Sequence, residues 1–256
     1  MKKLPLFALV VVASLGITAI ALGVTNTYQV SASTSPTTAG TTKKPVPIGL
    51  TFNYSVGEET NQRPSPVKQY KIKFAGLRVN TGAVKSTCTA NKINAAGSNS
   101  VCSAAAIVGS GSVDNRLGPT NDPSKQDLHC FLALTLYNAP NNHATLYLQG
   151  RKANPAPKDC ITDIDVAIDA SYIRSGTNTT LQFSVPPALL HPVPGLDNAV
   201  RNVTSTIKKI TKGSGKKRVA YYSSVGGCKK HQRAVTVTFV PESGTTRQAQ
   251  GFAKCK

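Results

Sequence analysis

The sequence has no tryptophan, a single methionine and only 11 acidic residues among 256. Hydrophobic residues make up 40% and charged residues only 16%, which argues against a disordered polyelectrolyte. A sustained heptad is absent, and the glycines follow no three-residue period, which excludes a coiled coil and a collagen-like chain. No nucleophile elbow, Walker loop, zinc-protease motif or EF-hand loop occurs either, so none of those enzyme or calcium-binding classes is indicated.

Long apolar runs are also scarce, with one exception at the N-terminus. Residues 1–3 are basic at two positions, and residues 4–24 carry no charge, which is typical of an export signal. Sites of the small-x-small type at 19–21 and 30–32 predict a cleaved signal peptide within residues 1–32, with an uncleaved anchor as the alternative. The chain is therefore expected to be secreted.

Residues 33–47 are rich in serine, threonine and proline and contain no aromatic side chain. This composition buries too little apolar surface to offset the loss of conformational entropy on ordering. It predicts an extended, mobile linker, followed by a single folded domain over residues 48–256.

Six cysteines follow the signal, an even number in a chain that is expected to fold in an oxidising compartment. Closing local loops costs the least chain entropy, which favours Cys88 with Cys102, Cys130 with Cys160, and Cys228 with Cys255 among the possible pairings. A zinc site is disfavoured because the sequence contains no CxxC pair. We expect neither a metal nor a cofactor.

Apolar residues alternate with polar ones in many short blocks, the period of strands with one buried face. Clear examples are residues 70–74, 132–136, 164–168, 181–185 and 235–239, and further candidates are 50–56, 107–113, 144–149, 203–210 and 218–223. Turn residues separate them at 139–142, 213–215 and 242–244. Only residues 197–203 have the pattern of a short helix. The pattern predicts an all-β fold, an antiparallel β-sandwich of about ten strands held by disulfides and preceded by a signal helix.

Several segments are similar to a family of secreted, cysteine-containing β-rich proteins of high-G+C Gram-positive bacteria. They are IVGSGSV at 107–113, LQFSVPPALLHPVPGL at 181–196, SVGGC at 224–228 and RAVTVTFV at 233–240. The resemblance covers most of residues 67–256 and implies export, local cysteine pairs and a sandwich fold. It implies no reaction, cofactor or binding residue.

One alternative is an envelope enzyme. The segment from Ser224 to Arg233 resembles the cysteine motif of L,D-transpeptidases, with Cys228 as nucleophile and His231 as base, but Val225 stands where that family has histidine. A reactive thiolate needs a free cysteine, whereas exported cysteines are usually bridged. A carboxylate site is the other enzymatic option. The only acidic cluster comprises Asp159, Asp163, Asp165 and Asp169, which we interpret as a solvent face paired with lysine and arginine in preference to a calcium site.

Basic residues are concentrated near the C-terminus, where no acid occurs between Asp197 and Glu242. The candidate polyanion-binding residues are Lys208, Lys209, Lys212, Lys216, Lys217, Arg218, Lys229, Lys230 and Arg233. Outside a cell, such charge suits an anionic cell-wall polymer or a membrane surface. Nucleic acid is not expected as a partner, because single-strand grooves interleave aromatic side chains with the charge. A solubilising face without a partner is the alternative.

The sequence thus predicts a non-enzymatic secreted protein that is held electrostatically at the cell envelope. A third possibility is a protein-interaction module with the proline-rich segment 186–195 as its contact surface. The alternative for that segment is a rigid crossover between strands.

Overall fold

The computed structural model describes residues 25–126, 128–152 and 160–256, so residues 1–24 of the predicted signal peptide 1–32, and Asp159, lie outside the described residues. Eleven strands form one antiparallel sheet in the order β1-β3-β11-β6-β7-β8-β9-β10-β4-β15-β16. Along the chain their bounds are Asn26–Ser35 (β1), Gly49–Glu58 (β3), Val67–Phe74 (β4), Ile107–Pro119 (β6), Leu128–Ala139 (β7), His143–Gly150 (β8), Ile164–Ser175 (β9), Asn178–Ser184 (β10), Leu196–Ile207 (β11), Gln232–Pro241 (β15) and Arg247–Lys254 (β16).

Smaller elements complete the fold. A three-stranded sheet has the order β2-β14-β5, and a two-stranded hairpin joins β12 to β13. The bounds are Val46–Pro47 (β2), Leu77–Val79 (β5), Thr211–Lys212 (β12), Val219–Ala220 (β13) and Tyr222–Ser224 (β14). Two short helices are Ala90–Ala96 (α1) and Pro187–Leu190 (α2), and 3-10 turns occupy Thr81–Ala83, Asn99–Val101, Ala104–Ala106 and Gly215–Lys217.

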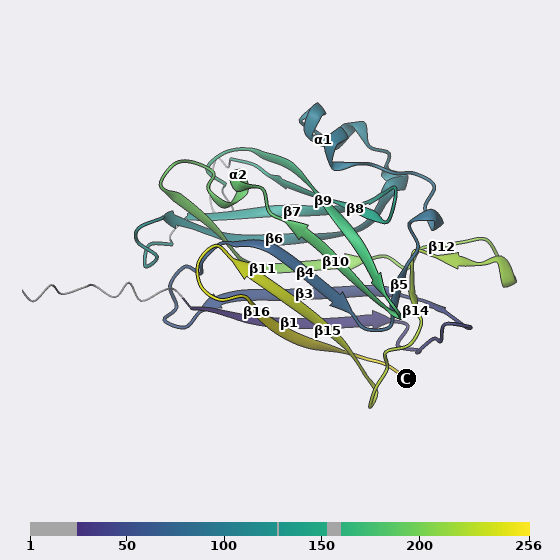
Figure 1. Ribbon diagram of the computed structural model, residues 1–256. Helices are drawn as coiled ribbons and strands as arrows, with labels where there is room; N and C mark the ends of the chain where they lie inside the picture. Colours follow the sequence, from purple (N-terminus) through teal and green to yellow (C-terminus); the bar gives the residue numbers. More distant parts are fainter. Residues whose placement is uncertain (1–24, 127, 153–159) are drawn as a thin grey trace, which may run out of the picture.

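The large sheet curls around a single core and nearly closes into a barrel (Figure 1). Because every neighbour reverses direction and the order contains eleven strands, the two end strands β1 and β16 run parallel to each other. They also touch: a Cβ on Gly251 of β16 would lie only 2.3 Å from the carbonyl oxygen of Val30 in β1. Glycine at this position therefore permits the close approach of the two edges.

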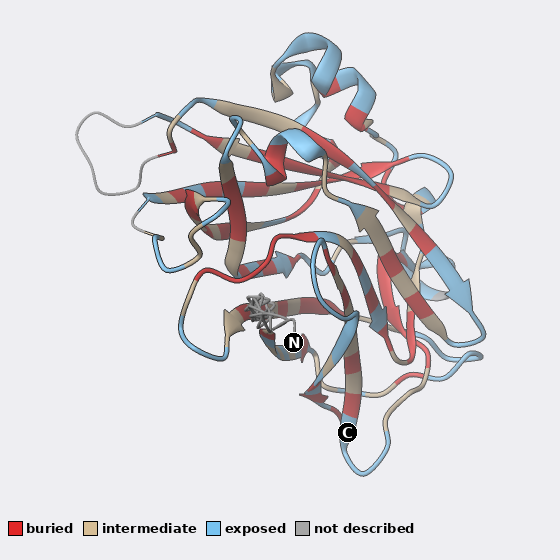
Figure 2. Ribbon diagram, turned by 60° about the vertical axis from the view of Figure 1, so that its left-hand side comes forward, coloured by how far each residue is buried: buried red, intermediate tan, exposed pale blue. Residues whose placement is uncertain are grey.

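Alternation along the strands fills the interior, as Figure 2 shows in the banding of buried and more exposed residues. Opposite parts of the sheet meet across the core like the two layers of a sandwich. Phe52 of β3 packs edge-on against Phe74 of β4 at 5.7 Å between ring centroids. Tyr54 and Tyr70, on the same two strands, lie 5.4 Å apart. The predicted antiparallel, sandwich-like all-β fold is confirmed.

The prediction of a mobile linker over residues 33–47 is wrong. Strand β1 reaches Ser35 and pairs along its whole length with β3. Beyond it, the amide of Ala39 donates to the carbonyl of Lys256, and the amide of Gly40 donates to the Ser224 hydroxyl. Short polar side chains are compatible with an edge strand, and ladder bonds to β3 compensate for the ordering cost. Cleavage after Ala32 would remove most of β1, whereas cleavage after Ala21 would leave it intact.

The short helix expected at residues 197–203 is also absent, because these residues belong to β11, between β3 and β6. A register shift between Val200 and Asn202 interrupts the two-residue alternation there. Such a bulge inserts one extra residue, which hides the strand period from a reading of the sequence. The one longer helix, α1, lies instead on the outer face of the sheet, where Ile93 packs against Tyr147 and Ala167.

Candidate functional site

All three predicted disulfides are present: Cys88–Cys102, Cys130–Cys160 and Cys228–Cys255. They indicate that the chain folds in an oxidising environment. Cys228 therefore has no thiol, which removes the Cys228–His231 nucleophile from consideration. No helix among the described residues is long and apolar enough to cross a membrane.

Seven of the nine predicted basic residues fall into two exposed groups. Lys208, Lys209, Lys212, Lys217 and Arg218 lie on or beside the β12–β13 hairpin, which projects from one end of the barrel (Figure 1). The side chain of Lys216 lies outside the described residues. Lys229 and Lys230 form the turn before β15 at the same end of the molecule. Within the described part of the chain, these seven side chains form no ion pair.

Arg233 does not belong to this surface. Its side chain is on the same face of β15 as Val235 and Val237, and only 2% of the residue is exposed. One nitrogen donates to the Ser224 hydroxyl, while Nε and the other terminal nitrogen have no partner. Burial lowers the pKa of this guanidinium. Arg233 is therefore a buried structural residue and not a polyanion ligand.

A shallow groove of about 690 Å³ lies beside the second basic group. Its cations are Lys229 and Lys230 on the turn and Lys73 on β4. The amide side chains of Gln232 and Gln250 line it as well, together with the half-exposed ring of Phe252 and with Asn178, Thr177 and Thr236. Lys73 comes from a distant part of the sequence, so the basic run did not include it. Three cations and several amides thus face one open groove on the outer side of β4, β15 and β16.

In the described part of the chain, Asp165 and Asp169 are paired with basic side chains, and Asp163 with a backbone amide. Asp165 accepts hydrogen bonds from Arg151, at 2.6 Å, and from Tyr147. Although partial burial acts in the opposite direction, these bonds hold the pKa of Asp165 below its usual value. Asp169 lies 2.9 Å from His143 Nδ1. Asp163 accepts from the backbone amide of Lys152.

A second polar cluster lies at the other end of the barrel and was not anticipated from the sequence. Nδ1 of His191 lies 3.1 Å from Asp197 Oδ1, and Nε2 lies 3.0 Å from Glu242 Oε1. Carboxylates only accept, so two such neighbours favour the doubly protonated imidazolium. The bond with Glu242, and then that with Asp197, raises the pKa of His191. The buried Arg63 completes the cluster, 3.2 Å from Asp197 Oδ2.

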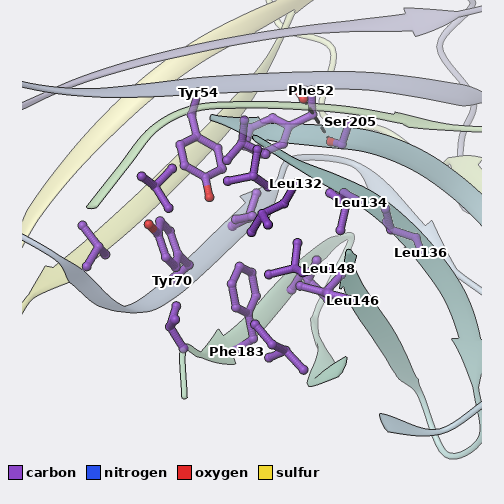
Figure 3. Close-up of a pocket in the computed structure, with 18 of the residues that line it drawn as sticks. Phe52, Tyr54, Tyr70, Leu132, Leu134, Leu136, Leu146, Leu148, Phe183 and Ser205 are labelled. Carbon is purple, nitrogen blue, oxygen red and sulfur yellow. Dashed lines mark hydrogen bonds between the residues drawn. The ribbon is translucent and has the colours of Figure 1, made fainter. Parts of the chain in front are cut away.

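The barrel interior is not completely filled. A cavity of about 100 Å³ lies among the core side chains shown in Figure 3. Phe52, Tyr54 and Tyr70 line it together with a group of leucines: Leu132, Leu134, Leu136, Leu146 and Leu148. Leu189 and Leu190 of α2, directly before His191 in the chain, also line it. The cavity arises where residues far apart in the sequence pack together, so no local sequence pattern predicts it.

Among the described residues, no group of three or more histidine, cysteine, aspartate or glutamate side chains has the arrangement of a metal site. Comparisons with protein-family models, curated proteins and solved structures find no match to this chain. The resemblance to secreted β-rich proteins of high-G+C Gram-positive bacteria therefore stays a prediction. The fold and its surfaces define a disulfide-bonded, nearly closed β-barrel with one strongly basic end.

Proposed function

We propose that the protein is exported and acts as a non-enzymatic binding protein, associating electrostatically with an anionic polymer of the cell envelope. The observation that carries this proposal is the groove bounded by Lys73, Lys229 and Lys230, at the barrel end that also carries the β12–β13 hairpin. Three disulfides and the uncharged segment at residues 4–24 support the location.

The chemistry of the groove favours a phosphate-bearing polyol chain over a flat membrane surface. Lysines supply compact, mobile positive charges, which suit a repeating anion with variable geometry. The amides of Gln232 and Gln250 offer donors and acceptors for hydroxyl groups, and Phe252 offers an apolar ring face. The hairpin lysines add long-range attraction, which concentrates the polymer at this end.

The test measures binding of the purified protein to poly(glycerol phosphate) at increasing salt. Affinity should fall steeply as salt rises, because exposed charges are screened over about 8 Å at physiological ionic strength. Replacing Lys73, Lys229 and Lys230 together with glutamine should weaken binding roughly tenfold. This expectation follows because each exposed ion pair with the polymer contributes about a few tenths to 1 kcal/mol of binding free energy. The matched control replaces three exposed lysines elsewhere, Lys68, Lys92 and Lys152, with the same loss of net charge.

If both triple variants lowered the affinity for the polymer equally, binding would depend on the net charge of the protein and not on the groove, which would contradict the proposed site. Binding that is unchanged at high salt would contradict the electrostatic mechanism. Vesicles of phosphatidylglycerol and phosphatidylcholine form the second arm of the experiment. Stronger binding to them than to the polymer would overturn the choice of partner.

A further inference from the structure

The interior cavity is the strongest feature that the basic surface does not use. Its volume of about 100 Å³ is well above the 10 to 15 Å³ that one water needs. It is roughly two thirds of an engineered apolar cavity of about 150 Å³ that binds benzene. The space therefore suits a ligand of about one ring. A full acyl chain would not fit without rearrangement of the core.

The lining indicates which atoms such a ligand carries. Nearly all surrounding groups are aromatic or aliphatic: Tyr70 and Phe183 stack with centroids 5.2 Å apart, and five leucines line the same space (Figure 3). An apolar ring gains dispersion and burial energy on this surface. A charged ligand would lose its hydration without compensation.

Two buried polar atoms of the lining have no hydrogen-bond partner among the described residues, the Tyr70 hydroxyl and the Asn198 side-chain oxygen, and the second can only accept. Asn198 of β11 is only 8% exposed, and its Nδ2 donates to the carbonyl of Leu189 at 2.7 Å. Its Oδ1 is buried and makes no hydrogen bond among the described residues. A buried amide oxygen left without a donor carries a desolvation cost of about 1 to 3 kcal/mol. A ligand hydroxyl at this end of the cavity would remove that cost.

We propose that the cavity binds a small monohydroxylated apolar molecule of the phenol class, with the ring among the leucines and aromatics and the hydroxyl donating to Asn198 Oδ1. This site is inside the barrel and separate from the outer groove, so either proposal can fail without the other. In this proposal the ligand enters past α2, whose Leu189 and Leu190 line the cavity. Polar contacts hold that segment: Asn198 with the Leu189 carbonyl, and His191 with Asp197 and Glu242.

Phenol and benzene are the probes, since they differ only in the hydroxyl. Binding to the full folded protein is followed by methyl NMR and by the shift in melting temperature, which rises with a saturable dependence when a ligand binds only the folded state. Phenol should bind about two- to thirteenfold more tightly than benzene, which corresponds to one net hydrogen bond of about 0.5 to 1.5 kcal/mol. Methyl shifts should appear at Leu132, Leu134 and Leu148 but not at the exposed Leu128.

Two variants localise the site. Val203→Phe places a ring in the cavity and should abolish binding, whereas Val219→Phe, at an exposed position outside the cavity lining, should leave it unchanged. Asn198→Leu should erase the preference for phenol while benzene still binds. If Val203→Phe does not fold, the methyl shifts of the unchanged protein decide the location by themselves.

Absence of saturable phenol binding, or methyl shifts spread over the surface, would overturn the proposal. Equal affinity for phenol and benzene in the unchanged protein would refute the role of Asn198.

Discussion

The contribution of β1 can be measured through one aromatic ring. Tyr28 stacks on Phe239 of β15, with centroids 4.1 Å apart and planes within 15°, so it joins the first strand to the far side of the seam. Tyr28→Ala removes this stack, worth about 1 kcal/mol. It also removes a half-buried side chain, worth about 1 kcal/mol, half of a typical fully buried one. The expected loss is about 2 kcal/mol of unfolding free energy.

Urea denaturation followed by circular dichroism measures this loss. With a slope of about 2 kcal/mol per molar, the midpoint should fall by about 1 M. Tyr28→Phe keeps the ring and should stay within about 0.5 kcal/mol of the original. Phe252→Ala, on the exposed face of the neighbouring β16, is the matched control and should have a similarly small effect. If Tyr28→Ala lowered the unfolding free energy no more than Phe252→Ala does, residues 26–35 would not be a structural strand, and the reasoning would be refuted.

Three further predictions concern the remaining links between distant segments. Replacing Cys228 and Cys255 with alanine opens a loop of sequence separation 27 and should lower the unfolding free energy by about 3.5 kcal/mol in urea titrations; a loss below about 1 kcal/mol would contradict this. The raised pKa of His191 means that its contribution is fully present below pH 6.5 and is lost as pH rises through the folded-state pKa. The stability advantage over His191→Gln should therefore shrink across that window, and an advantage that grows with pH would count against the cluster. Arg233→Met removes a buried cation with two unpartnered nitrogens, so thermal denaturation should show stability retained or increased, not the loss of several kcal/mol typical of breaking a satisfied buried ion pair.

Period-two alternation was enough to predict much of the sheet. In β15, Val235, Val237 and Phe239 alternate with threonines and are each at most 1% exposed, and β7 follows the same rule with its leucines. The same parity places Arg233 on the inner face. Grouping it with the surface lysines gave its charge more weight than its position in the strand. Arg233, predicted as a surface cation, is thus one of the most buried charged residues among those described.

The errors at the N-terminus and in β11 have different causes. In β1, Tyr28, Val30 and Ala32 do alternate, but these residues fall within the predicted signal peptide 1–32, and the last residues of the strand, 33–35, fall in the serine- and threonine-rich segment predicted as a linker. In β11, the shift between Val200 and Asn202 breaks the period itself. The groove, the His191 cluster and the cavity join residues that are far apart in sequence, such as Lys73 with Lys229, or Arg63 with Asp197. The spacing of residues along the sequence does not reveal which distant residues come into contact in the fold.

The meeting of β1 with β16 also has a consequence for the order of events during folding. These strands are the first and the last of the large sheet along the chain, so their contact has the largest sequence separation of any strand contact in it. Hairpins such as β6–β7 and β7–β8 form from neighbouring residues, whereas the seam needs the intervening strands in place before its two edges can meet. Closure of the barrel at this seam is therefore expected to be a late event in folding.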